Sequence, residues 1–351
     1  MLQHTLERLY LCSMKQLTLL LAFVLLASCH TNKGKDPAAP AHRGIYHWKT
    51  TYNPSQWERD WMKEHKIDRL YVKLFDVEPG AKHGYDDWSM VPVATTSFRQ
   101  KLPKELDVVP VVYITVEAIR ALEQSSDYNL SSRYAEMMVT RIERMMVEHW
   151  GGTLKEVQFD CDWTWNTRDV YFMLCQRVKS ILHEKGIRLS GTLRLHQLSQ
   201  VGYDYESEDD EIPFDRSLLM CYNTGRIGDA NIKNSILDFN DVTPYLKRYK
   251  KDFLPCCDVA YPVYGWGVAF DEEGYFVRLI NSHTLAEGNA WKEAPVRQAA
   301  IREDWGEAED IVKTQTALPM LDNKHTTILF HLDSLNLSKY SHEEIETFYS
   351  R

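Results

Sequence analysis

The sequence predicts an α/β protein that folds as a (β/α)8 TIM barrel with an insertion after the seventh strand. Strand-like apolar segments alternate with helix-like segments along most of the 351 residues, and eight strand-like segments can be counted. The chain also has no internal repeat and no second hydrophobic domain. A doubly wound open sheet is the alternative, but no glycine-rich phosphate loop follows the first strand, which disfavours its nucleotide-binding form.

The eight predicted strands are rich in β-branched, aromatic and other apolar residues, which favour extended backbone. They are Gly44–Thr50, Arg69–Glu78, Asp107–Thr115, Val157–Thr164, Arg188–Leu198, Ser217–Thr224, Asp258–Gly265 and Thr327–Asp333. The carboxyl ends of the strands of such a barrel meet at one rim, where active sites are built. Side chains at these strand ends are therefore the first candidates for a functional site.

The segments between the strands carry helix signals. Ser131–His149 has apolar residues at helical spacing, and Thr167 and Gly186 have the residue types that begin and end the next helix. Further helices are predicted at Ser55–Lys66, Thr96–Lys104, Asp241–Lys251, Pro295–Thr314 and Ser341–Tyr349. Two connections are unusual, since Tyr203–Asp215 is strongly acidic and 266–326 is long enough to form a subdomain.

The composition excludes one class of partner and allows another. The net charge is −9 and no basic patch is visible, so we expect no nucleic-acid partner. The chain holds 10 Trp and 19 Tyr. Aromatic side chains suit the apolar faces of sugar rings, although burial in the core explains the same abundance.

The first residues have the pattern of a bacterial lipoprotein signal. An apolar run from Leu19 to Ala27 is too short to span a membrane comfortably, and the Leu-Ala-Ser-Cys that ends it resembles a lipobox. We therefore predict a signal peptide over residues 1–28, with Met14 as an alternative start, and lipidation at Cys29. An uncleaved anchor is the other interpretation.

The predicted mature lipoprotein has a polar tether over residues 29–42 and a barrel domain over 43–351. Its expected location is the bacterial cell envelope, held by its lipid at the outer membrane of a Gram-negative bacterium, on the periplasmic or surface face. The cysteines beyond Cys29 are odd in number and lack CxxC spacing, so we expect no disulfide framework. We also expect no metal ion and no cofactor.

The fourth strand carries the most informative pattern. Side chains of a strand alternate between two faces. One face holds Val157, Phe159, Cys161 and Trp163, and the other holds Gln158, Asp160, Asp162 and Thr164. Two carboxylates on one surface repel, so at least one needs a cation, a hydrogen-bond donor or a shifted pKa, as at many catalytic sites. The other interpretation is a strand end with two solvated aspartates.

Other strand ends supply polar and aromatic side chains to the same mouth. Lys73 or Arg194 could balance the two aspartates, unless they belong to a polar layer of internal ion pairs. His196 is either a catalytic base or a satisfied hydrogen-bonding residue. The residues expected to contact a ligand are Trp48, Lys73, Glu78, Arg194, His196, Asn223, Tyr264, Trp266 and Asp333.

Three short motifs carry a resemblance to a known family. Phe159–Trp163 (FDCDW) looks like the strand-four signature of the family-18 glycoside hydrolases, the chitinase-type barrels. Met220–Asn223 (MCYN) is similar to that family's strand-six motif, and Tyr261–Gly265 (YPVYG) is similar to its strand-seven motif. The motifs occur in the family's order, each on the matching predicted strand.

The resemblance implies roles for three residues and shows two departures. By position, Asp162 would orient a substrate acetamido group, Asp160 would support Asp162, and Tyr222 would hold the acetamido oxygen; these three are the expected catalytic residues. The family's proton-donating Glu falls on Thr164, and its strand-six Asp falls on Asn223. Without a Glu at position 164, the family's chemistry lacks its proton donor.

Three functions remain open at this point. The first is a glycoside hydrolase whose acid sits elsewhere on the rim, at Glu78, Glu117, Asp333 or Asp162. The second is a non-catalytic lipoprotein that binds an oligo- or polysaccharide with a degenerate glycosidase barrel. The third, a metal hydrolase using Asp160, Asp162 and His196, has no matching ligand spacing. We favour the hydrolase slightly, because Arg194 and His196 are expected to face the same mouth.

Overall fold

The computed structural model describes residues 42–125, 127, 129–200, 212–248, 257–287, 300–318 and 325–350. The predicted signal peptide, Cys29 and the tether up to residue 41 lie outside these ranges, as do residues 203–211 of the acidic connection. No helix within the described ranges is long and apolar enough to cross a membrane.

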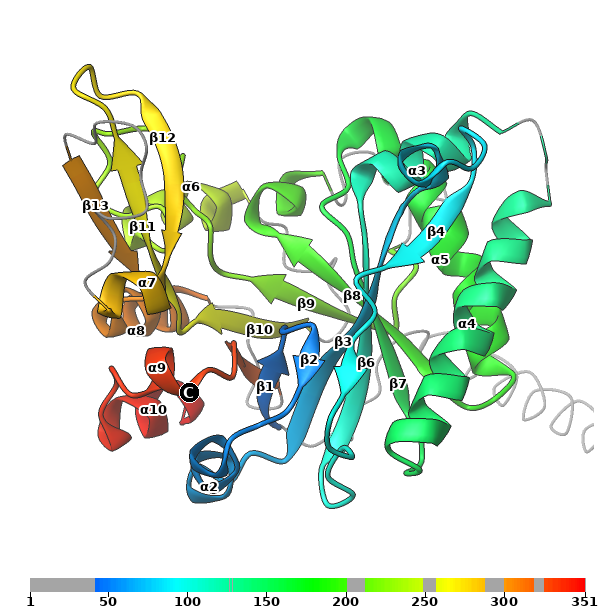
Figure 1. The fold of residues 1–351 in the computed structure, drawn as a ribbon, viewed down its shortest axis with the longest axis horizontal. Coiled ribbons are helices and arrows are strands. Elements are labelled where there is room, and N and C mark those ends of the chain that lie inside the picture. Colours follow the sequence, from blue (N-terminus) through cyan, green and yellow to red (C-terminus); the bar gives the residue numbers. More distant parts are fainter. Residues whose placement is uncertain are drawn as a thin grey trace, which may run out of the picture. The chain divides into compact units, whose positions relative to one another are not determined.

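Eight parallel strands close into a barrel (Figure 1), which confirms the predicted fold. The sheet runs in the order β1-β14-β10-β9-β8-β7-β6-β3-β4, and β1 also pairs with β3 to close the ring. The barrel strands are β1 (Arg43–His47), β3 (Arg69–Pro79), β6 (Asp107–Ile114), β7 (Glu156–Asp160), β8 (Arg188–Arg194), β9 (Arg216–Met220), β10 (Cys257–Pro262) and β14 (Thr327–Phe330). Outside the ring, β4 (Met90–Val93) pairs antiparallel with β3.

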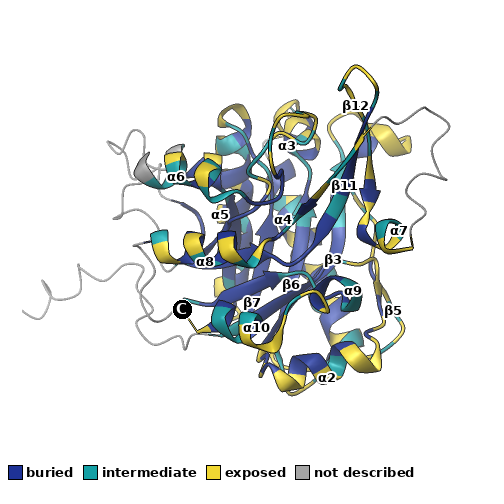
Figure 2. Cartoon of the chain, turned by 90° about the vertical axis from the view of Figure 1, so that its left-hand side faces the viewer, coloured by how far each residue is buried: buried dark blue, intermediate teal, exposed yellow. Residues whose placement is uncertain are grey.

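Helices cover the outside of the barrel. They are α2 (Gln56–Glu64), α3 (Val116–Glu123), α4 (Leu130–His149), α5 (Arg168–His183), α6 (Phe239–Arg248), α9 (Ser334–Leu337) and α10 (His342–Tyr349). Figure 2 shows their outward faces exposed and the strands buried beneath them. Ser55 caps α2 through a reciprocal pair of hydrogen bonds with Glu58, as its residue type predicted.

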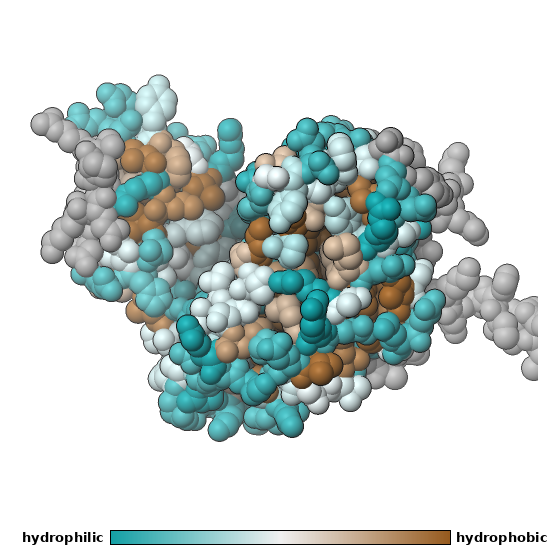
Figure 3. Space-filling model, turned by 45° about the vertical axis from the view of Figure 1, so that its right-hand side comes forward, coloured by the Kyte–Doolittle hydropathy of each residue, from teal (hydrophilic) through white to brown (hydrophobic). Residues whose placement is uncertain are grey.

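Each barrel strand separates two hydrophobic layers by its alternation. Outward-facing side chains such as Ile45, Phe159 and Leu329 pack under the helices. Inward-facing side chains fill the barrel itself, and the inner cluster consists of Tyr46, Tyr71, Val109, Val111, Leu218, Met220, Tyr222, Ala260 and Ile328. On the outer surface, Figure 3 shows mainly hydrophilic residues, with hydrophobic ones in separate patches.

The amino ends of the strands hold buried charges that are paired with one another. Arg69 donates to Asp107 at 2.7 Å and to Glu156 at 3.3 Å. Arg216 donates to Asp258 through Nε at 3.1 Å. A buried charge is tolerated only when it is paired and hydrogen-bonded. A polar layer of internal ion pairs therefore does exist in this barrel, at the end opposite the strand-end motifs.

The insertion after β10 forms a small sheet of its own. In it, β11 (Gly265–Phe270) lies between β12 (Phe276–Asn281) and β13 (Ala300–Trp305), both antiparallel to it. The helix α7 (Ser282–Ala286) packs on this sheet, whereas α8 (Ala308–Ala317), which follows the sheet in sequence, packs against the barrel helices α6 and α10. The helix predicted at Pro295–Thr314 is thus wrong over 300–305, which form a strand, while 295–299 lie outside the described residues.

The helix predicted at Thr96–Lys104 is also wrong. The segment contains the two-residue strand β5 (Ser97–Phe98), which pairs with β2 (Thr51–Tyr52) and continues as irregular backbone. The Ser97 N–H donates to the carbonyl of Thr50 at 2.9 Å, and Thr96 bonds the carbonyl of Lys73 at 2.6 Å. Because these groups are engaged across the fold, they are not available for helical hydrogen bonds.

Two tryptophans near the end of β7 provide a test of the packing between the barrel strands and the outer helices. Trp163 is fully buried and meets Phe172 of α5 edge-on at 5.3 Å, whereas Trp165 is half exposed. We expect Trp163→Ala to lower the free energy of unfolding by about 3–5 kcal/mol. The control Trp165→Ala should cost less than about 1 kcal/mol. Equal costs in urea unfolding would contradict the difference in burial between the two side chains.

Candidate functional site at the carboxyl end of the barrel

The end of β7 presents two faces, as its sequence predicted. Phe159, Cys161 and Trp163 are buried in the layer between strands and helices. Gln158 points into the barrel, where its side chain accepts a hydrogen bond from the Tyr46 hydroxyl. Asp160 lies on the same inner face, one strand step nearer to the mouth.

Asp160 is a buried carboxyl group at the base of the mouth. It is 3% exposed and accepts a hydrogen bond from the Thr192 hydroxyl at 2.6 Å. Burial raises the pKa of Asp160 from 3.8 to about 6; the positive charge of Arg194 opposes this shift, and the negative charge of Asp162 adds to it. Asp160 therefore keeps a proton far more readily than an exposed carboxyl group.

Asp162 forms an ion pair with Arg194. The Arg194 Nε lies 2.5 Å from one carboxylate oxygen of Asp162, and Nη2 lies 3.1 Å from the other. This fork-to-fork arrangement is among the strongest pairings that side chains make. Of the two cations that the sequence offered, Arg194 is therefore the one that pairs with Asp162. Burial distinguishes the two aspartates, because Asp160 is buried and Asp162 is 37% exposed beside a cation.

His196 does not lie on the strand with Arg194 as predicted. Strand β8 ends at Arg194, and Leu195–Ser199 form a 3-10 turn in which His196 is exposed. The buried side chain of Gln197 holds this turn, since it accepts from the Arg194 N–H at 2.7 Å and donates to the Trp163 carbonyl at 2.7 Å. Although His196 is largely exposed, partial desolvation of its ring lowers its pKa; the charge of Asp162 opposes this shift and that of Arg194 adds to it.

An aromatic cluster fills the mouth around Phe330, the last residue of β14. Its ring centroid lies 5.4 Å from that of Tyr46, 5.5 Å from Trp48, 5.3 Å from Tyr222 and 5.6 Å from Tyr264. These distances are typical of favourable tilted and edge-on ring pairs. Four strand ends are therefore joined by one aromatic side chain, and we name these five residues the aromatic cluster.

The cluster continues toward the insertion. Tyr264 donates a hydrogen bond to Asn223 at 2.7 Å and meets the Trp266 ring edge-on at 5.4 Å. Asn223 has a φ of 56°, a left-handed conformation that Asn adopts more easily than most residues. Trp266 is partly buried and its indole N–H donates to Ser235 at 3.1 Å. The structure thus brings together three of the predicted ligand-contacting residues.

Lys73 faces the other side of the mouth. Its ammonium group lies 5.5 Å from the centroid of the Trp48 ring and 3.0 Å from a carboxylate oxygen of Asp76. The sequence suggested that Lys73 could balance Asp160 and Asp162. Its ion-pair partner is Asp76, because β3 changes register between Lys73 and Phe75. Lys73 therefore contributes to the mouth beside Trp48 and not beside the aspartate pair.

Two of the predicted residues have partners outside the aromatic cluster. Glu78 pairs with His83 at 3.0 Å. Asp333 is buried, pairs with Lys49 at 2.9 Å and with His283 at 3.1 Å, and caps α9. Although burial works in the other direction, these hydrogen bonds lower the pKa of Asp333 to about 2. Asp333 is therefore ionised near neutral pH and cannot donate a proton there.

Thr164, which stands at the position of the family acid, is hydrogen-bonded to Thr167 within a tight turn. Its backbone N–H donates to the Thr167 hydroxyl at 3.0 Å, and the two hydroxyl oxygens are 3.3 Å apart. Thr167 occupies the N-cap position of α5 as predicted, but its hydroxyl makes no capping hydrogen bond and instead bonds back to Thr164.

Two buried donors in the mouth have no hydrogen-bond partner among the described residues. They are the Tyr222 hydroxyl and the Nη1 atom of Arg194. The Arg194 guanidinium lies over the Tyr222 ring, 5.6 Å from its centroid, so the two groups are neighbours. Buried donors are normally satisfied, by protein, water or ligand, because an unpaired one costs free energy.

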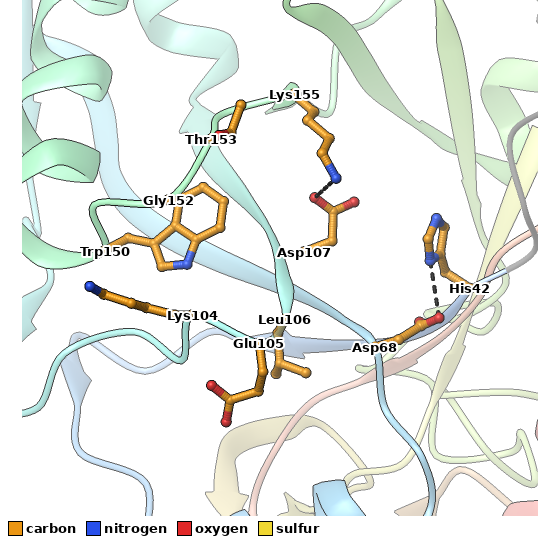
Figure 4. Close-up of a pocket in the computed structure, with 10 residues that line it drawn as sticks. All are labelled: His42, Asp68, Lys104, Glu105, Leu106, Asp107, Trp150, Gly152, Thr153 and Lys155. Atoms are coloured by element: carbon orange, nitrogen blue, oxygen red, sulfur yellow. Dashed lines mark hydrogen bonds and ion pairs between the residues drawn. The ribbon is translucent and has the colours of Figure 1, made fainter.

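A further pocket lies at the opposite end of the barrel (Figure 4). Its lining residues stand just before β1, β3, β6 and β7, and include His42, Asp68, Asp107, Trp150 and Lys155. Asp68 is paired with His42, and Asp107 with Lys155. Conserved chemistry in such barrels is built at the carboxyl ends of strands, so this pocket is not our candidate site.

The described residues do not support the metal-hydrolase interpretation. Asp160, Asp162 and His196 do not form a group close enough to share an ion among the residues that the structure describes. The group that does is formed by Glu64, His65 and His342, on α2 and α10 and away from the strand ends of the mouth.

Sequence reasoning missed Phe330, Tyr113 and Gln197. Phe330 is two residues after the inward-facing Ile328, so alternation along β14 could have placed it in the mouth. Tyr113 follows Val111 on β6 in the same way and lies 6.3 Å from Trp48, ring to ring. Gln197 gave no signal, because its role depends on carbonyl groups of a distant strand.

Comparison with solved structures identifies the fold. The spore cortex-lytic enzyme SleL of Bacillus cereus superposes with a TM-score of 0.53 at 14% identity, over 89% of this chain and 75% of that one. The chitinase ChiB of Flavobacterium johnsoniae superposes with a TM-score of 0.53 at 12% sequence identity, over 89% of this chain and 95% of that one. A class V chitinase of Nicotiana tobaccum superposes with a TM-score of 0.55 at 9% sequence identity, over 89% of this chain and 99% of that one. The chain has a family-18 glycoside hydrolase-like fold.

The sequence itself is distant from proteins with this family-18-like fold. No protein-family model matches the chain, and no curated protein matches it. The predicted resemblance is therefore confirmed at the level of the fold, on which the three motifs occupy strands β7, β9 and β10 and the residues after them. The roles that the resemblance gives to individual residues remain predictions.

The pKa of Asp160 leads to a pH prediction. Because this pKa is higher in the folded than in the unfolded chain, the folded state binds more protons between about pH 4 and pH 6, and stability falls as pH rises through that window. Asp160→Asn removes the charge and keeps an acceptor for Thr192. We expect the variant to exceed the wild type by about 2–3 kcal/mol at pH 7, and this advantage to vanish near pH 4.

Urea unfolding of both proteins from pH 4 to pH 7 measures this difference directly. The exposed Asp87→Asn variant is the control, and it should stay within about 0.5 kcal/mol of the wild type at every pH. A difference between wild type and Asp160→Asn that does not change with pH would mean that Asp160 titrates normally.

Proposed function

We propose that the barrel mouth binds an oligosaccharide that carries N-acetyl groups and does not hydrolyse it. The observation that carries this proposal is the pair of unpartnered donors, the Tyr222 hydroxyl and the Arg194 Nη1 atom. A carbonyl oxygen has two lone pairs and accepts from two such donors. The carbonyl of an acetamido group, placed between them, would satisfy both.

The aromatic cluster supports a sugar ligand. Trp48, Tyr264 and Trp266 present partly or largely buried rings at the mouth, next to polar groups that include Lys73 and Asn223. Sites for small molecules commonly combine apolar and aromatic walls with a few fixed polar groups. A pyranose ring has the matching chemistry, since its C–H faces are apolar and its edges are hydroxylated.

Two features argue against hydrolysis. Thr164 has no carboxyl group, and it is held in its own turn by Thr167. Both carboxylate oxygens of Asp162 are already engaged by the Nε and Nη2 atoms of Arg194. The mouth thus keeps its binding groups without a proton donor at the family's position.

The comparisons support the class of ligand. A mutant class V chitinase from Nicotiana tobaccum was solved in complex with NAG4, and it superposes with a TM-score of 0.54 at 10% identity. A catalytic-domain mutant of an Ostrinia furnacalis chitinase was solved with (NAG)5, and it superposes with a TM-score of 0.52 at 11% identity. By analogy with these folds, chito-oligosaccharides are the first ligands to test on this chain.

A glycoside hydrolase with a relocated acid is the second candidate function. Its support is Asp160, whose raised pKa of about 6 leaves part of the carboxyl groups protonated near neutral pH. The argument against it is that a substrate can hardly reach Asp160, which is 3% exposed and hydrogen-bonded to Thr192.

The experiment titrates the full chain, purified in detergent, with chitotetraose by calorimetry and analyses the mixture for shorter sugars. We expect binding without products. Tyr222→Phe should weaken binding by about tenfold, because it removes one buried donor to the ligand. The control Tyr349→Phe should bind normally, since its hydroxyl bonds the carbonyl of Gly44 at the other end of the barrel.

Each other outcome contradicts a stated part of the proposal. Products that disappear in Asp160→Asn would establish the hydrolase instead. Equal binding by Tyr222→Phe and the wild type would remove Tyr222 from the ligand site. No heat with chitotetraose, while circular dichroism shows a folded chain, would exclude chito-oligosaccharides as ligands.

We also propose that the chain is lipid-anchored in the bacterial cell envelope through Cys29. The support is the lipobox-like sequence Leu26–Cys29 after the apolar run. In a bacterial host fed radiolabelled palmitate, the wild type should carry label and Cys29→Ser should carry none. The control Cys12→Ser should keep the label. Label on Cys29→Ser would contradict the anchor.

A further inference from the structure

The end of α2 and the start of α10 bring His342 next to Glu64, which is 278 residues away in sequence, and to His65. The two helices lie side by side in Figures 1 and 2. One ligand atom from each of Glu64, His65 and His342 lies within 4.8 Å of the others. We propose that these three side chains bind a divalent transition-metal ion, with zinc as the best match.

His65 is held in place by its surroundings. It is 3% exposed, its ring packs 4.6 Å from that of Trp61, and its Nδ1 lies 2.9 Å from Glu346. A carboxylate on Nδ1 holds the proton there and leaves the lone pair on Nε2, as in carboxylate–histidine–zinc sites.

Glu346 is itself held in place. The Arg43 guanidinium donates to both of its carboxylate oxygens, at 2.9 and 3.1 Å, and to the His65 carbonyl at 3.0 Å. Glu346 is therefore oriented and neutralised by Arg43, so that it positions His65 and does not compete as a ligand. Such a supporting group is what separates a metal site from a chance cluster of side chains.

The other two ligands can adjust. His342 and Glu64 are more than half exposed, and their side chains meet at 2.9 Å. The His342 ring lies 4.8 Å from that of His65, at an interplanar angle of 33°. Zinc holds nitrogen and oxygen ligands at about 2.0–2.2 Å in a tetrahedron, which places ligand atoms roughly 3.4 Å apart. Small rotations of the two exposed side chains around the fixed His65 would reach this spacing.

The ligand set selects the metal. Two imidazoles and one carboxylate suit zinc, with water in the fourth position, and are too nitrogen-rich for calcium or magnesium. Binding would replace the Glu64–His342 hydrogen bond and join the first described helix of the barrel to the last one. Sequence reasoning found no metal site, because the ligands lie on helices at opposite ends of the described chain.

The test uses the full chain in detergent with a histidine-free tag, stripped with a chelator and dialysed against Zn²⁺. We expect one zinc per chain with micromolar or tighter affinity, and a melting temperature raised by ~5 °C at a hundredfold excess over Kd. Substitution with Co²⁺ should give the visible absorption of tetrahedral coordination.

Variants locate the ion. His342→Gln and Glu64→Gln should each weaken binding by more than about tenfold, and Glu346→Gln by about 10–100-fold through His65. The matched control His83→Gln, which alters another exposed histidine paired with a glutamate, should bind as the wild type does. The inference is overturned if the wild type binds no zinc, or if His342→Gln and Glu64→Gln bind it unchanged.

Discussion

The pairing of β1 with both β14 and β3 is the constraint on which the rest of the structure depends. Ile45 stands opposite Leu329 on one side and Leu70 on the other, so the first strand closes the ring. A closed ring of eight strands has an interior just wide enough for side chains to fill. Because all eight strands are parallel, closure also collects their carboxyl ends at one rim, where the motifs of three distant segments meet.

The buried cations and hydrogen-bond donors inside the ring have different partners at its two ends. At the amino ends, Arg69 and Arg216 are matched with buried carboxylates, so every charge has a partner that stabilises the fold. At the carboxyl ends, Tyr222 and Arg194 keep donors without a partner among the described residues, and Asp160 keeps a raised pKa. The amino ends thus hold matched buried charges, whereas the mouth holds donors without a partner among the described residues, which supports our proposal of a binding site there.

The sequence predicted whatever depends on strand alternation. The register of β7 and β8 sets Gln158 opposite Ser190, so two-residue steps bring Asp162 to Arg194, and the ion pair follows from pattern alone. It could not predict what depends on irregularities. The change of register after Lys73 and the turn held by Gln197 move side chains to positions that no period describes. The histidine–glutamate cluster on α2 and α10 was equally hidden, because helix packing alone unites it.

The Arg194–Asp162 pair also bears on the choice between the two functions proposed for the mouth. A hydrolase of this fold needs one carboxyl group that is protonated and able to reach the leaving oxygen. Asp162, the more accessible aspartate, is engaged in an ion pair with Arg194, whereas burial raises the pKa of Asp160, the less accessible one, to about 6. The aspartate with the raised pKa therefore has little access to a ligand. Thr164, held in a turn by Thr167, has no carboxyl group to take this role, which is why we propose binding without hydrolysis.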